Sequence, residues 1–126
     1  MIGGIDIIIP AIGNPAALDD CVRVIRRYWP RARYEDAISG EKLRDYNAVP
    51  SVSIKQLLIY RDERAEEAWD SENPEAPPNT MIYLILSTDF VTVVLDDPNA
   101  EEMRLILESV RSYLGMDILN TVAEAA

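Results

Sequence analysis

The sequence predicts an α+β fold, a two-layer arrangement in which a mixed or antiparallel sheet carries its helices mainly on one face. Two apolar runs, 81–86 and 91–95, flank a short polar break, which is typical of a β-hairpin. An Asx-Pro pair precedes each long amphipathic segment, at 14–15 and at 97–98. A length of 126 residues suits one domain. We therefore expect a single acidic domain, 1–126, with the order β-α-β-β-α-β-β-α.

The N-terminal third predicts a strand, a helix and a second strand. The run 5–9 is short and β-branched, which favours a strand. Asn14 is expected to cap the following helix, and Pro15 fits its first position because no amide hydrogen is needed there. Pro30 ends the helix, and 32–37 is expected to be a weaker strand. The helix places these apolar side chains on one face: Leu18, Cys21, Val22, Ile25 and Trp29.

The middle of the chain is less regular. Turn residues in 38–50 indicate an ordered loop, with a short strand as the alternative. The run 52–60 predicts a strand, after which Asp62 is expected to cap a short acidic helix over 63–69. Three prolines within 71–79 exclude regular structure there and indicate a surface loop or a hinge.

The hairpin is expected to be central. Its first strand, 81–86, is apolar on both faces, which is typical of a strand covered on both sides. A helix of this chain, the C-terminal tail or a second molecule are the candidates for the second cover. The connection lacks Asn-Gly and Asp-Gly, so it predicts a loop of three or four residues.

The last long helix is expected to begin at Asp97-Pro98 and to end at Gly115. Residues 116–126 would then form a short C-terminal helix or a tail. The apolar stripe that predicts the helix recurs at helical spacing and consists of Met103, Ile106, Leu107, Val110 and Leu114.

Composition limits the classes of partner. Twelve basic and 22 acidic residues give a net charge of −10, which argues against binding nucleic acid or an anionic membrane. The same charge favours a basic protein partner, which an acidic surface attracts. The chain shows neither a secretory signal pattern nor an apolar run of roughly 20 residues. A cytoplasmic location is the resulting expectation.

The chain lacks histidine and has one cysteine, which excludes Ser-His-Asp and Cys-His catalysis and histidine or multi-thiolate metal sites. We expect no catalytic residue, metal or cofactor, and we interpret Cys21 as a core thiol. A carboxylate site for a divalent metal is the alternative, and Asp6, Asp96 and Asp97 are its best candidates. A solvent-facing position, a strand exit and a helix cap would explain the same three residues without a metal.

Two groups of charges are candidate binding sites. Five of the twelve basic residues lie within eleven positions, and they are expected either to bind phosphate or an acidic partner, or to complement the helix dipole and pair with acids: Arg23, Arg26, Arg27, Arg31 and Arg33. The first three are the candidate anion-binding residues. Around the short acidic helix, the candidate partner-binding residues are Glu63, Glu66, Glu67, Trp69 and Asp70. The alternative for this group is a solvated helix whose tryptophan is anchored in the core.

These features favour a non-enzymatic protein–protein interaction module whose acidic surface binds a basic partner. In size and charge the chain resembles bacterial immunity proteins, which neutralise toxins, and type III secretion chaperones; the likeness does not extend to a motif. The alternatives are a carboxylate and divalent-metal enzyme and a self-associating structural domain, such as a homodimer.

Overall fold

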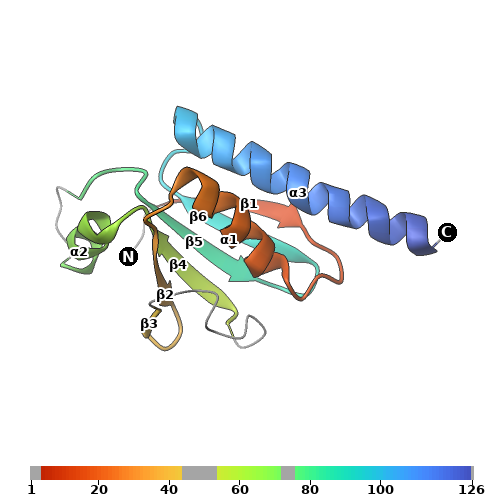
Figure 1. Ribbon diagram of the computed structural model, residues 1–126, viewed down its shortest axis with the longest axis horizontal. Coiled ribbons are helices and arrows are strands. Elements are labelled where there is room, and N and C mark those ends of the chain that lie inside the picture. Colours follow the sequence, from red (N-terminus) through yellow and green to blue (C-terminus); the bar gives the residue numbers. More distant parts are fainter. Residues whose placement is uncertain (1–3, 44–53, 72–75, 126) are drawn as a thin grey trace.

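The computed structural model describes residues 4–43, 54–71 and 76–125 (Figure 1). Within these ranges the elements are β1 (Ile5–Pro10), α1 (Ala17–Tyr28), β2 (Arg33–Asp36), β3 (Lys42–Leu43), β4 (Gln56–Tyr60), α2 (Glu63–Asp70), β5 (Met81–Leu86), β6 (Phe90–Leu95) and α3 (Glu101–Ala125).

The described strands form one sheet with the order β1-β6-β5-β4-β2-β3, and every neighbouring pair is antiparallel. The predicted α+β class is confirmed, and the sheet is antiparallel rather than mixed. The element order contains the predicted elements and adds β3, a two-residue strand within the segment expected to be a loop or a short strand. The predicted strand over 52–60 is shorter, because β4 begins at Gln56; residues 52 and 53 lie outside the described ranges.

Helices α1 and α3 lie side by side across one face of the sheet (Figure 1). Alternate residues of the central strands point into the layer between the sheet and these helices, as the period of two requires. Ile82 and Leu84 of β5 and Val91 of β6 are fully buried there. The predicted apolar faces of both helices pack against them, and the indole Nε1 of buried Trp29 donates to Glu102 Oε1 at 2.7 Å.

The second face of the sheet is covered by α2 at one end. Tyr60 and Met81, which are register partners, pack with Ala65 of α2 in a separate apolar cluster. Trp69 is half-buried against this cluster, and its Nε1 donates to Thr80 Oγ1 at 2.9 Å. The prediction that β5 is covered on both faces is therefore met at its Met81 end by a helix of the same chain.

The helix starts show how the Asx-Pro pairs fold. At both sites the side-chain oxygen accepts the amide two residues later, from Ala16 to Asn14 at 3.0 Å and from Asn99 to Asp97 at 2.9 Å. Each pair thus makes an Asx turn. Helices α1 and α3 begin beyond these turns, so the predicted starts at 14–15 and 97–98 were a few residues too early. Asp62 caps α2 as predicted, since its Oδ1 accepts from the amide of Ala65 at 2.8 Å.

Helix α3 does not end at Gly115, as the sequence predicted, but continues to Ala125 and runs past the end of the sheet (Figure 1). Gly115 lacks the positive φ of a glycine that ends a helix. A helical glycine costs only about 1 kcal/mol relative to alanine. The ten residues that follow contain no proline, so nothing in the sequence forces the helix to stop there.

Candidate functional site

Exposed apolar side chains gather around β1. Six large hydrophobic residues of the described ranges are exposed, and four of them lie on β1 or beside it. Ile5 and Ile8 belong to β1 and are 49% and 62% exposed, Ile12 follows the strand at 59%, and Phe90 is the register partner of Pro10 at 36%. Single exposed apolar residues are ordinary, whereas a large contiguous group of them is typical of interaction surfaces.

The backbone of β1 has an unpaired edge, because the strand is the last of the described sheet on that side. The amide of Ala11 donates to the carbonyl of Asp89 at 2.9 Å, which continues the register of β1 with β6. Hydrogen-bonded pairs recur at every second residue of an antiparallel ladder. Ile5, Ile7 and Ile9 therefore bond β6.

The intervening residues of β1, which are Asp6, Ile8 and Pro10, direct their backbone groups away from the sheet. Pro10 fits this assignment, because proline has no amide hydrogen and is tolerated on the free side of an edge strand. The outward edge thus offers the amides of Asp6 and Ile8 and the carbonyls of all three residues. We define this edge, together with Ile5, Ile8, Ile12 and Phe90, as the β1 edge surface.

Two exposed acidic side chains lie on or next to the β1 edge surface. Asp6 on β1 and Asp89 in the hairpin loop are both exposed. Residues 1–22 and 65–103, which include β1, β5 and β6, contain no lysine or arginine. Arg104, the first basic residue of α3, is paired with Glu108 at 3.2 Å.

The predicted acidic surface on α2 divides into two parts. Lys42 Nζ lies 2.6 Å from Asp70 Oδ2 and 3.6 Å from Glu66 Oε2, and it also pairs with Glu35. Burial opposes the charge of Lys42, but its bonds to Asp70 and Glu35 outweigh burial and raise its pKa. These two α2 carboxylates therefore hold the helix against the sheet, as does Trp69, while Glu63 and Glu67 remain exposed.

The predicted arginine group is spread along the outer surface of α1. Arg23 is exposed and donates to Tyr113 Oη on α3 at 3.1 Å, and Arg27 is exposed one turn further along. Arg26 is half-buried. The other two arginines of the predicted group, Arg31 and Arg33, line an open hollow of about 460 Å³ together with Arg64, Asp62 and Glu63. The carboxylates of Asp62 and Glu63 offset most of the positive charge of the three arginines, which disfavours anion binding in this hollow.

Two of the three candidate metal-binding carboxylates, Asp96 and Asp97, have structural contacts of their own. Asp96 Oδ2 accepts from the amide of Asn79 at 2.9 Å, and Asp97 accepts within its Asx turn. Asp6 is exposed on β1 opposite Val94. No group of three or more acidic or cysteine side chains within the described ranges is arranged to hold a metal ion. In the same ranges, no helix is both long enough and apolar enough to cross a membrane.

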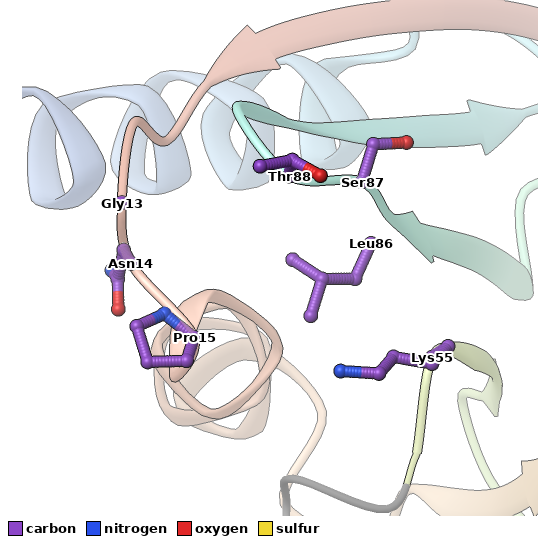
Figure 2. Close-up of a pocket in the computed structure, with 7 residues that line it drawn as sticks. All are labelled: Gly13, Asn14, Pro15, Lys55, Leu86, Ser87 and Thr88. Carbon is purple, nitrogen blue, oxygen red and sulfur yellow. The ribbon is translucent and has the colours of Figure 1, made fainter.

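An open hollow of about 430 Å³ lies between the loop before α1 and the end of β5, and its lining residues are drawn in Figure 2. Lys55 extends toward Pro15 and Leu86, while Ser87 and Thr88 line the opposite side. Gly13 lies in this loop with a φ of +65°, a left-handed conformation that glycine adopts without strain. The hollow combines one exposed ammonium group with two hydroxyl-bearing residues, and it contains none of the predicted site residues.

Cys21 is fully buried on the sheet side of α1. Burial, reinforced by the charge of Asp20, raises the pKa of its thiol to about 12 from an ordinary 9.0. This environment suppresses the thiolate, which is the nucleophilic form.

The buried thiol predicts a loss of stability at alkaline pH. Between pH 9 and pH 12 the unfolded thiol ionises while the folded thiol keeps its proton, so Cys21 should lower the free energy of unfolding by on the order of 1 kcal/mol per pH unit. Urea titrations of wild type and Cys21→Ala across this range measure the contribution as the change in their difference. Parallel curves would contradict the assignment of a proton-retaining buried thiol.

Comparisons with known proteins give no match: no family model, no curated protein and no solved structure is similar to this chain at a significant level. Function is therefore inferred from the geometry of this chain alone.

Proposed function

We propose that the protein is a non-enzymatic protein–protein interaction module that binds a basic partner. The observation that supports this best is the β1 edge surface, where exposed apolar side chains adjoin unpaired backbone groups among acidic residues. Apolar contact would supply affinity, and the acidic surroundings would select and attract a cationic partner.

Self-association is the second candidate, and the same unpaired edge supports it. An exposed, apolar edge strand is a template for pairing with another chain, including a second copy. The net charge of −10 opposes this arrangement, because two copies would bring like charges together, whereas a basic partner would neutralise them. We therefore place the basic partner first.

Affinity purification with quantitative mass spectrometry tests the proposal. Wild-type protein should enrich one or more basic proteins, and the double variant Ile8→Lys, Phe90→Lys should lose them. Ile38→Lys is the matched control, because Ile38 is 67% exposed in the turn between β2 and β3, away from β1. Equal recovery with all three proteins, or enrichment of acidic proteins alone, would contradict the proposal.

A separate variant tests whether the exposed carboxylates of α2 contribute to binding. Glu63→Gln with Glu67→Gln removes two outward charges and leaves the Lys42 contacts in place. If α2 contributes to docking as the sequence predicted, this variant should weaken capture of the same basic proteins and reduce its dependence on salt. Unchanged capture would restrict the partner surface to β1.

A further inference from the structure

We infer that the partner binds as an extended basic segment that adds a strand to β1. This inference rests on the proposed function and specifies how the partner is held. Strand addition uses backbone hydrogen bonds for affinity and alternate side chains for specificity. The β1 edge surface supplies both, because its outward amides and carbonyls lie between exposed apolar side chains.

The free edge has the length and backbone that an added strand needs. β1 spans six residues, and it carries no lysine that would discourage pairing. The residues that face outward, Asp6 and Ile8, each provide one donor and one acceptor, so a segment opposite them forms up to four hydrogen bonds. Pro10 provides only an acceptor and sets the limit of this pairing at the end of the strand.

Side chains of β1 on the second face of the sheet determine which side chains the bound segment should have opposite them. Asp6 and Ile8 share this face, since successive residues of a strand alternate between faces. Phe90, beside Pro10, extends the apolar part of the same face. A segment residue opposite Asp6 is therefore expected to be lysine or arginine, and one opposite Ile8 is expected to be apolar.

On the opposite face, the segment meets isoleucine side chains. Ile5 is half-exposed, while Ile7 is partly buried against the main core and Ile9 is fully buried. Segment residues opposite these three positions are therefore expected to be apolar and β-branched. The resulting pattern combines an apolar strand with a basic residue at one fixed position.

The charge of this region identifies the occupant as a basic segment rather than a second copy. A second β1 would bring another Asp6 and another acidic chain of charge −10 to the same edge. Asp89, at the tip of the β5–β6 loop, adds a further exposed negative charge beside Phe90. A cationic segment converts both charges from repulsive to attractive.

A synthetic peptide of defined sequence tests this inference directly. The peptide Arg-Thr-Val-Val-Val-Lys-Val-Arg, aligned antiparallel, places its fourth residue opposite Ile8 and its lysine opposite Asp6. N-methylation of the fourth and sixth amides removes the donors that face β1, and we expect binding to weaken at least about tenfold. N-methylation of the third and fifth amides is the matched control, because these amides face away from β1.

Protein variants provide the second half of the test, with binding followed by fluorescence anisotropy of the labelled peptide. Ile8→Pro removes an outward donor and should also weaken binding at least about tenfold. Asp6→Asn should weaken it about two- to fivefold and reduce its salt dependence. Ile38→Thr, at a distant exposed isoleucine, should bind as wild type does.

Equal affinity for the two N-methylated peptides would overturn strand addition, while the basic partner of the proposed function would still be recovered by affinity purification. Sedimentation that shows a dimer of wild type and a monomer of Ile8→Pro would assign the edge to a second copy and also overturn the inference. Failure of the wild-type protein to recover any basic partner by affinity purification would instead contradict the proposed function. Because the peptide comparison leaves the protein unchanged, it decides the question even if a protein variant fails to fold.

Discussion

Trp29→Ala is expected to lower the free energy of unfolding by about 3–5 kcal/mol. Trp29 is 1% exposed and belongs to the core between the sheet and its two long helices. Its removal leaves a cavity that the packed layer fills only in part, and Glu102 loses the indole donor at 2.7 Å. Urea denaturation with a constant m-value measures the change as a shift of the midpoint.

Trp69→Ala is the control for this prediction, because it removes the other tryptophan of the chain. Trp69 is half-buried in the smaller cluster under α2, so its loss should cost clearly less than that of Trp29. Equal costs, or a larger cost for Trp69, would contradict the assignment of the main core to the layer beneath α1 and α3.

A proline scan of β1 is expected to give opposite results at neighbouring positions. Ile7 bonds β6 opposite Val93, so Ile7→Pro removes a ladder hydrogen bond and leaves an interior carbonyl without its partner. We expect a loss on the order of 3 kcal/mol when the lost apolar packing of Ile7 is included. Ile8→Pro removes only an outward amide and an exposed side chain, and it should cost about 1 kcal/mol or less.

Thermal and urea unfolding of the two proline variants measure the contrast. Ile8→Thr, which keeps the amide, separates the effect of the side chain from that of the backbone. A larger loss of stability for Ile8→Pro than for Ile7→Pro would mean that the backbone of Ile8, rather than that of Ile7, bonds β6. This result would remove the basis for strand addition.

The sequence predicted much of the fold because the apolar periodicity and the turn and capping residues indicate the same elements in this chain. The apolar stripes of α1 and α3 and the apolar run of β5 are buried when the two helices pack on one face of the sheet. The sequence underestimated α3, because Gly115 resembles a helix stop and only its φ distinguishes the two cases. It placed helix starts too early at Asn14 and Asp97, because an Asx turn and a helix cap use the same residues.

The candidate site was predicted less completely than the fold. Composition predicted a basic partner, and that remains a proposal. The sequence placed the binding surface on α2, but Glu66 and Asp70 contact Lys42 from β3, a long-range pairing that local patterns do not reveal. The free edge of β1 depends on strand order, which the sequence did not predict. The only local signals were the alternation that places Asp6 and Ile8 on the same face of the strand, and Pro10 at its end.

Residue-resolved hydrogen–deuterium exchange of the protein with its recovered basic partner tests the central claim most directly. Strand addition at β1 predicts that the amides of Asp6 and Ile8 exchange rapidly in the free protein and become strongly protected in the complex. The amides of Ile7 and Ile9 should be protected in both states, because they already bond β6. Protection that appears on α2 with no change at Asp6 and Ile8 would contradict the claim that β1 receives the partner.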